Sequence, residues 1–303
     1  MKILSREQTA YEKNDQFESA LRYQNIINSK GDTNMIVGIG DNCIDYYLPP
    51  INIKRTGGNV VNVAVNLRKH NFAATYIGTV GTDKKGEIIL SSLNKFGLDT
   101  SHVSRLNGET GLTEIEVVNG EYIIKSENYG VSNQIDISDE TLEFLKENAR
   151  IIHLSITGSA FTVIEKLKDI DIPISCDISN FFFHYTEEHW ASLLPYIDYV
   201  FVSGGSTLLE EEAIEIAQKI ASFGTKNIII TLGSNGCIGF FENRVISQPS
   251  LLKPSEVIDP LGAGDAFISG FLSSVISANN TSEQHLKIAS QWAAKTCQHY
   301  GAW

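Results

Sequence analysis

The sequence predicts an α/β fold with a doubly wound, mostly parallel sheet that is flanked by helices and carries a small β lid. Two observations support the sheet. Short β-rich runs such as 35–40 alternate with helical stretches such as 60–69, and the runs are apolar on both faces. Strands of a sheet that helices cover on both sides have this composition. A third observation, a hairpin signal that breaks this alternation, supports the lid.

The β-rich runs are short and the stretches between them have helical periodicity, which together predict parallel strands joined by helical crossovers. The runs lie at 35–40, 74–80, 150–155, 172–177, 198–203 and 227–233. The helical stretches lie at 60–69, 84–96, 138–149 and 211–223.

The lid is predicted from two segments. Residues 112–125 have the pattern of two strands joined by Asn119-Gly120, a strong signal for a hairpin turn because both residue types tolerate positive φ. The short β-rich run at 46–57 is the second segment. We expect the two to form one small sheet over an edge of the main sheet.

Residues 1–33 differ from the rest of the chain. They are polar and carry a loose helical stripe through Phe17, Leu21 and Ile27, and Met35 stands at the start of the first strong strand. We therefore expect an N-terminal helical extension over 1–33 and one main domain over 34–303, with the lid segments near 46–57 and 112–125 inside it.

Composition narrows the possible partners. The chain of 303 residues has a net charge of −12 and a pI near 5.0, which argues against a nucleic-acid partner because such partners need a basic surface. No stretch reaches the ~18 apolar residues of a membrane span, and the polar N-terminus has no signal-peptide core, so we expect a cytoplasmic protein. The cysteines form no CxxC pair, so a structural metal site or disulfide framework is not expected.

The segment 258–276 carries the clearest chemistry. Its apolar stripe predicts a helix that begins near Asp265, directly after Gly262-Ala263-Gly264. Small residues at a helix start let backbone N–H groups approach a phosphate, and the helix dipole adds to the attraction. An aspartate there would repel the anion, but it could take a proton from a hydroxyl that attacks the phosphate. The alternative is that Asp265 only caps the helix.

A second glycine motif lies at 57–70. It places Gly57 and Gly58 before a helix, with Asn59 and Asn62 in the first turn. Asparagine amides in this position can hydrogen-bond the hydroxyl groups of a sugar, and the glycines let a substrate lie against the backbone. The alternative is an ordinary glycine turn with an asparagine cap.

These two motifs together resemble the ribokinase-like (PfkB) carbohydrate kinases, and the resemblance covers about 34–303. The family's N-terminal signature is similar to the glycine motif at 57–70 together with IGTVGTDKKGEIIL (77–90), and its C-terminal signature is similar to DPLGAGDAFISGF (259–271). The resemblance implies an enzyme that phosphorylates a primary hydroxyl of a small sugar, with ATP and Mg²⁺ and possible activation by K⁺. It also implies a possible homodimer through the lid.

The resemblance assigns roles to individual positions. Asp265 matches the catalytic base, and the amides of Gly262, Ala263 and Gly264 match its anion hole. The substrate contacts fall on Asp45, Gly57, Gly58, Asn59 and Asn62. The turn that borders the nucleotide falls on Thr231, Gly233 and Gly236. Ala289 could border the adenine or serve close helix packing. Asp259 matches a residue often near a monovalent cation.

Three departures affect the expected metal sites. Pro260 replaces a usual threonine, which puts the monovalent cation in doubt. The usual Asn-x-x-Glu, which organises Mg²⁺, falls on Ser203-Gly204-Gly205-Ser206, so neither residue is kept. Asp177 is the one residue kept from a usual Asp-x-Asn-x-Arg. Mg²⁺ is therefore expected to rely on Asp177 or on phosphate oxygens alone.

Two finer features indicate a subgroup. GDNCID (40–45) and AAKTCQHYGAW (293–303) look most like the fructoselysine 6-kinases, which phosphorylate a sugar–lysine adduct. Asp41 could suit a substrate that carries an amine, or it could be a solvated residue at a strand end. The alternatives for the chain are a fructose, other ketose or nucleoside kinase, and a catalytically silent sugar-binding sensor.

Other nucleotide-binding folds fit poorly. A dinucleotide-binding glycine motif would start at Gly38 and Gly40, but Cys43 occupies its third glycine position and Pro49-Pro50 follows where a helix should begin. A P-loop is excluded because GxxxxGK[ST] is absent from the sequence.

Overall fold

The computed structural model describes residues 34–118, 121–157, 160–277, 279–299 and 301–303. The helical extension expected over 1–33 and the expected Asn119-Gly120 turn lie outside these residues. In the part that is described, no helix combines the length and the apolar character needed to cross a membrane.

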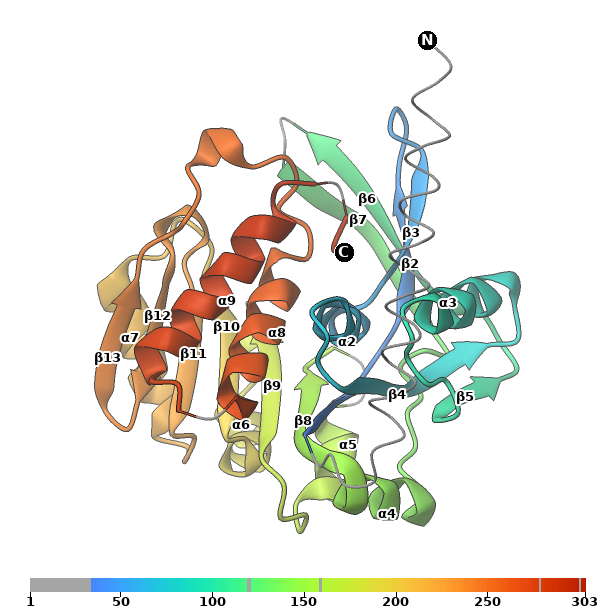
Figure 1. Ribbon diagram of the computed structural model, residues 1–303, viewed down its shortest axis with the longest axis horizontal. Coiled ribbons are helices and arrows are strands. Elements are labelled where there is room, and N and C mark those ends of the chain that lie inside the picture. The colour runs from blue at the N-terminus through green and yellow to red at the C-terminus, as the bar shows by residue number, and fades with distance from the viewer. Residues whose placement is uncertain (1–33, 119–120, 158–159, 278, 300) are drawn as a thin grey trace. The chain divides into compact units, whose positions relative to one another are not determined.

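The described residues form a nine-stranded main sheet in the order β13-β12-β11-β10-β9-β8-β1-β4-β5 (Figure 1). All neighbours from β11 to β5 are parallel, and the hairpin β12-β13 adds two antiparallel strands at one edge. The strands are β1 Met35–Ile39, β4 Ala74–Gly81, β5 Val103–Leu106, β8 Ala149–Ser155, β9 Ile174–Ser179, β10 Tyr199–Ser203, β11 Asn227–Thr231, β12 Cys237–Phe241 and β13 Arg244–Gln248.

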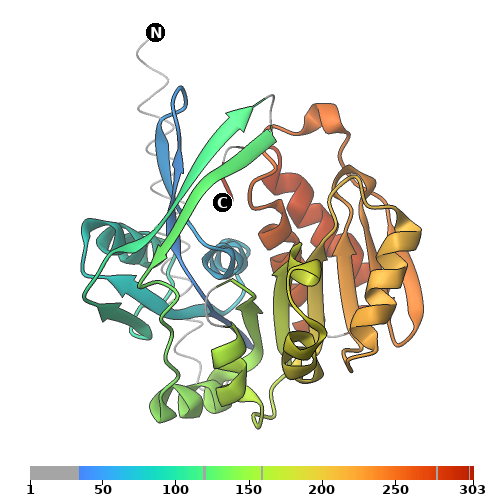
Figure 2. The same cartoon turned by 180° about the vertical axis from the view of Figure 1, so that it is seen from behind.

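Helices cover both faces of this sheet. One face carries α2 Asn59–Lys69, α3 Lys84–Lys95, α8 Ala263–Ile276 and α9 Ser282–Thr296, and the other carries α4 Asp139–Asn148, α5 Ala160–Leu167, α6 Glu187–Leu193 and α7 Glu210–Ala221 (Figures 1 and 2). Short 3-10 helices lie at Phe181–Phe183, Leu194–Tyr196, Gly233–Asn235 and Pro254–Glu256.

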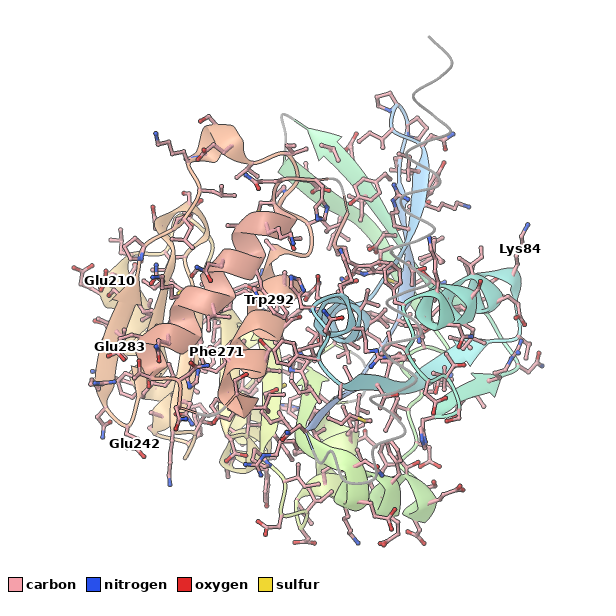
Figure 3. The ribbon with its side chains drawn as sticks, in the orientation of Figure 1. Lys84, Glu210, Glu242, Phe271, Glu283 and Trp292 are labelled. Atoms are coloured by element: carbon pink, nitrogen blue, oxygen red, sulfur yellow. The ribbon has the colours of Figure 1, made fainter. Side chains whose placement is uncertain are left out.

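The core is divided by the sheet. Along β1, Val37 and Ile39 pack in the cluster that contains α4 to α7, whereas Ile36 packs with Phe271 of α8, which Figure 3 labels. Successive side chains of a strand point to opposite faces, so a strand covered on both sides must be apolar throughout. The doubly wound fold predicted from the sequence is confirmed.

A second sheet of four strands, in the order β3-β2-β6-β7, forms the predicted lid. Its strands are β2 Cys43–Tyr47, β3 Ile53–Gly57, β6 Thr110–Val118 and β7 Glu121–Gly130. β2 pairs with β3 in the antiparallel and with β6 in the parallel direction. The run expected at 46–57 is therefore the end of β2, a turn and β3, and the hairpin expected at 112–125 extends further at both ends.

Helix α8, which carries the Gly262-Ala263-Gly264 motif and Asp265, begins at Ala263, two residues before the expected start. Gly262 is its N-cap and has a left-handed φ of 76°. The first turn of α8 therefore includes Gly264 and Asp265, so that the backbone and the carboxylate expected to act together belong to one turn of helix.

Candidate active site

A cavity of about 470 Å³ lies where the carboxyl ends of four parallel strands meet the lid. Asp41 follows β1, Thr157 follows β8, Asp177 lies in β9 and Ser203 ends β10, and all four line the cavity. This edge of an open parallel sheet is where such folds bind ligands. The lid contributes Cys43, Asp45, Thr113, Ile115, Ile124, Glu127, Asn128 and Tyr129 to the lining.

Asp265 lies at the cavity wall in the first turn of α8 and is buried. Its Oδ2 accepts a hydrogen bond of 2.7 Å from Nδ2 of Asn62, in the first turn of α2. Burial raises the pKa of the Asp265 carboxyl well above its usual value, and the bond from Asn62 opposes that rise. The arrangement is more than a helix cap, because the Asp265 side chain is held toward the cavity by a residue from another helix.

The two glycines before Asp265 differ in their surroundings. At Gly262, a Cβ would stand 2.2 Å from Cβ of Ala302, so packing alone requires glycine. At Gly264, a Cβ would meet no atom within 4 Å, yet Gly264 lines the cavity. Its lack of a side chain leaves space that the protein itself does not fill. Ala263 is absent from the described lining, and its N–H donates to the carbonyl oxygen of Pro260 (3.1 Å).

The Asp45 side chain lies against Gly57 on the lid. Asp45 lies on β2, lines the cavity and accepts a hydrogen bond of 3.2 Å from Sγ of Cys43. A Cβ at Gly57 would stand 2.0 Å from Oδ2 of Asp45, so glycine is needed there to hold the carboxylate against the β3 backbone. Gly57 itself does not line the cavity. Burial raises the pKa of Asp45 to about 6.

The start of α2 contacts β9 through Asn59. Its Nδ2 donates to Oδ2 of Asp177 (3.1 Å), and the Ser179 N–H donates to Oδ1 of the same carboxylate (2.7 Å). Burial raises the pKa of Asp177 to about 6, and both hydrogen bonds oppose the rise. Gly58 has a φ of 108°, and a Cβ there would stand 2.8 Å from Cα of Asn42. Asn59, Gly58 and Asp177 all line the cavity.

Asp41 is buried rather than solvated. It accepts a hydrogen bond of 3.0 Å from Oγ1 of Thr157, and burial raises its pKa. Thr157 escaped the sequence analysis, although its place just after the strand at 149–155 marks it as a residue at the carboxyl edge of the sheet.

The cavity lining is strongly acidic. It includes the carboxylates of Asp41, Asp45, Asp177, Asp265 and Glu127, and among the described lining residues there is no lysine, arginine or histidine. A phosphate group in this cavity must therefore be met by backbone N–H groups and by a metal ion that travels with it. A ligand with an ammonium group would meet opposite charge.

The residues expected at the nucleotide lie next to this cavity rather than in its lining. Thr231 ends β11 and pairs in register with Ser203, a lining residue. Gly233 and Gly236 follow it with φ of 54° and 95°. Ala289 has no exposed surface and packs against Gly270 of α8, a placement that favours its helix-packing role.

The expected cation positions differ from each other. Oδ1 of Asp259 accepts the Leu261 N–H (2.9 Å), and Oδ2 accepts the Gly301 N–H (2.9 Å) and the Tyr47 hydroxyl (3.3 Å). Asp259 is also not among the described residues that line the cavity, so its position does not support a cation bound there. Asp177 keeps its cavity-facing position. Within the described ranges, no group of three or more His, Cys, Asp or Glu residues could hold a metal ion.

Several lining residues were missed because their positions depend on the paired lid and on loops. Strand alternation brings Thr113 and Ile115 of β6 to the cavity, whereas Glu114 between them bonds Ser126 on β7. The segment after β9 contributes Ser179, Asn180 and Phe181, and the loop before α8 contributes Pro260 and Leu261.

The chain is similar in sequence to known carbohydrate kinases. Residues 52–303 match the family model described as pfkB family carbohydrate kinase. The fructoselysine 6-kinases of Shigella flexneri and Escherichia coli strain K12 are each 34% identical over 266 residues, covering 88% of this chain and 98% of the relative. The fructosamine kinase FrlD of Bacillus subtilis is 30% identical over 271 residues, covering 88% and 92%.

Solved structures of other kinases have the same fold as this chain. Arabidopsis thaliana ribokinase complexed with ribose and ATP superposes with a TM-score of 0.76 at 22% identity, covering 89% of this chain and 94% of that one. Xylella fastidiosa fructokinase with bound ATP gives 0.74 at 18% identity, with the same coverage.

Proposed function

This chain belongs to the pfkB family of carbohydrate kinases, and from this premise we propose that it phosphorylates the 6-hydroxyl group of fructoselysine with ATP. ATP-dependent phosphorylation of a carbohydrate is the activity of the family. The acceptor and the roles of individual residues are the proposal. In the reaction the acceptor oxygen bonds to the γ-phosphorus, the bond from that phosphorus to ADP breaks, and the hydroxyl proton leaves.

Asp265 is the group that takes this proton. The observation that carries the assignment is its buried carboxylate, held by Asn62 at 2.7 Å beside the open space at Gly264. A carboxylate with a raised pKa is a stronger base than one in water. The first turn of α8 directs its N–H groups and helix dipole toward the transferred phosphoryl group.

Asp45 and the first turn of α2 would hold the sugar. Asp45, Asn59 and Asn62 line one continuous cavity with Asp265, and carboxylate and amide groups are suited to sugar hydroxyls because they offer acceptors and donors. Fixing the sugar leaves one primary hydroxyl against the base, which is the positioning that phosphoryl transfer requires.

Mg²⁺ fits this cavity through Asp177. That carboxylate is the sequence-predicted metal residue that lines the cavity, and oxygen ligands of this kind suit Mg²⁺. When bound with ATP, the ion neutralises phosphate charge that the acidic lining cannot. The replacement of the usual Asn-x-x-Glu by Ser203-Gly204-Gly205-Ser206 leaves its remaining positions to phosphate oxygens and water. We keep K⁺ activation out of the proposal because the Asp259 carboxylate is bonded to Leu261, Gly301 and Tyr47 and does not line the cavity.

The choice of fructoselysine rests on two supports. Relatives named for this activity are 34% identical over 98% of their length, and the acidic lining favours an acceptor with a cationic arm. We place the lysine part of the acceptor toward the lid, where Glu127 is the glutamate that lines the cavity. Asp41, which follows β1, lines the same cavity, and burial together with the charge of Glu127 raises its pKa.

A coupled ADP-release assay tests the acceptor. We expect kcat/KM for fructoselysine to exceed that for free fructose and for adenosine by tenfold or more under the same Mg-ATP concentration. If fructose or adenosine is preferred by tenfold, the acceptor assignment is wrong while the carbohydrate kinase activity stands. Failure to turn over any of the three, with fructoselysine still bound, would favour a sugar-binding sensor.

We also propose a homodimer formed through the lid. Ile53 on β3 and Ile123 on β7 are 40% and 45% exposed, and large apolar side chains on a sheet face often mark an interface. Light scattering of Ile123→Glu against the wild-type protein tests this, with a monomeric variant expected. The cytoplasmic location expected from the sequence stays a prediction.

A further inference from the structure

The last described segment, residues 301–303, passes between the two helices that carry the glycine motifs. Gly301 donates its N–H to Asp259 (2.9 Å), and the carbonyl oxygen of Ala302 accepts a hydrogen bond from Nδ2 of Asn66 (3.2 Å). Ala302 also occupies the space in which a side chain at position 262 would stand. The segment is therefore fixed against both α2 and the start of α8.

Trp303 reaches the active site through Asn62. Its Nε1–H donates to Oδ1 of Asn62 at 2.7 Å, and Nδ2 of the same amide donates to Asp265 at 2.7 Å. An indole N–H can only donate, so the side of the amide that faces Trp303 must be the oxygen. The other side, which faces Asp265, must then be the NH₂ group. The indole and the carboxylate thus hold the amide in one orientation from its two sides.

We propose that Trp303 is a positioning residue for the catalytic base, acting through the orientation of the Asn62 amide. The proposal rests on the proposed role of Asp265 and adds to it a residue 38 positions further along the chain. Without the indole donor, Oδ1 of Asn62 loses this partner, and the bond to Asp265 no longer has the support of a second bond on the same amide. The amide can then shift, which lengthens or breaks the hydrogen bond that now holds the base.

The packing around Trp303 keeps its ring in place. Phe96, at the end of α3, meets the indole edge-on with ring centroids 4.9 Å apart and an interplanar angle of 80°. Trp303 also borders a second cavity of about 330 Å³, so a smaller ring can be placed there without overpacking. Trp303→Phe therefore removes the N–H donor while it keeps an aromatic ring for Phe96.

The test compares Trp303→Phe with Trp292→Phe, both assayed with fructoselysine and Mg-ATP. Trp292 lies on α9 and stacks on His70 with centroids 3.7 Å apart, so its replacement removes an indole that has no part in this chain of hydrogen bonds (Figure 3). For Trp303→Phe we expect kcat to fall about tenfold, the scale of one hydrogen bond in a transition state, with KM within about twofold. Trp292→Phe should match the wild type in both constants.

The pH dependence of kcat/KM distinguishes a loss of positioning of Asp265 from a general disruption of the protein structure. The acidic limb of kcat/KM reports the base in the free enzyme, and losing the bond from Asn62 raises the pKa of Asp265, so the limb moves to higher pH in Trp303→Phe. The other charged groups that face Asp265 are Asp177 on β9, Asp45 on β2 and Asp41 after β1. They are the same in both proteins, so the difference between the profiles reports the amide.

A rescue variant completes the test. Trp303→His returns a five-membered ring with a nitrogen at the position of the indole nitrogen, and we expect it to recover part of the kcat lost in Trp303→Phe. A Trp303→Phe protein with wild-type kcat and an unmoved acidic limb overturns the proposal, as does equal loss in Trp303→Phe and Trp292→Phe. Asp265→Asn is assayed alongside: if it keeps activity, the base assignment fails, whereas its loss with a silent Trp303→Phe rejects the positioning role alone.

Discussion

Asn62 donates a hydrogen bond of 2.7 Å to Asp265 across 203 positions of the sequence. The bond joins the first turn of α2 to the first turn of α8, and so connects the two glycine motifs. Taken alone, each motif also had a purely structural interpretation: a helix cap for Asp265, and a glycine turn with an asparagine cap for the motif at 57–70. Their direct contact inside one cavity favours a shared catalytic role.

The first prediction concerns Asp265→Asn. Asparagine keeps the size of the side chain and an oxygen that accepts from Asn62, but it cannot take the proton of the acceptor hydroxyl. We expect kcat to fall by about 10²–10⁴-fold, the usual scale for a general base, with the Kd of fructoselysine changed little. Steady-state kinetics and calorimetric titration measure the two quantities. Near-normal turnover would show that proton removal does not depend on Asp265.

The second prediction concerns the lysine arm of the acceptor. Glu127 is exposed on β7 and lines the cavity, so its ion pair with an ammonium group is worth at most about 1 kcal/mol. Glu127→Gln should therefore lower kcat/KM for fructoselysine by about three- to fivefold and leave that for fructose unchanged. Glu114→Gln is the matched control, because Glu114 bonds Ser126 and does not line the cavity. Equal effects of the two variants would contradict the placement of the arm.

The third prediction concerns stability. Burial raises the pKa of Asp45 from its usual 3.8 to about 6. The folded protein therefore holds this proton more tightly than the unfolded chain, and the stability contributed by the protonated group is lost as pH rises through about 6. At pH 8 the ionised carboxylate costs about 3 kcal/mol of unfolding free energy relative to pH values below 3.8.

Asp45→Asn removes this cost. We expect the ligand-free variant to melt several degrees above the wild type at pH 8, and the difference to shrink toward pH 4. Calorimetry of both proteins across this range measures it. A variant no more stable than the wild type at pH 8 would show that Asp45 is better solvated or better paired than its burial indicates.

The fourth prediction concerns the first 33 residues. β1 starts at Met35, between β4 and β8, and both glycine motifs follow it in the chain. A protein that begins at Met35 should therefore fold and bind ATP with the Kd of the full chain, as measured by melting temperature and calorimetric titration. Insoluble or unfolded protein would show that residues 1–33 complete the core or an interface between subunits.

Much of the main sheet was predictable, because buried parallel strands are apolar throughout and stand out in the sequence. β5 and the hairpin β12-β13 were not expected. β5 has three exposed residues among its four, and β13 is mostly exposed, so neither has the continuous apolar pattern of an inner strand. β12 is buried throughout and was missed although it has that pattern. The start of α8 was misplaced by two residues because apolar periodicity does not detect a left-handed glycine cap at Gly262.

The site was predictable where it follows local motifs and not where it depends on tertiary contacts. Asp265 and Asn59, singled out by their sequence context, and Asp45, singled out by the family resemblance, all line the cavity. Thr157 could have been found from its place after a strand. The bond from Trp303 to Asn62 spans 241 positions and has no local pattern to predict it.

The lid and the first turn of α8 come from separate parts of the chain. β2, β3, β6 and β7 form their own sheet and supply one wall of the cavity, whereas Gly262, Gly264 and Asp265 come from the start of α8. Mutations in the lid can therefore alter which acceptor is accepted without disturbing the chemistry. We therefore expect related genes to diverge in acceptor preference through substitutions in the lid, while the start of α8 is inherited unchanged.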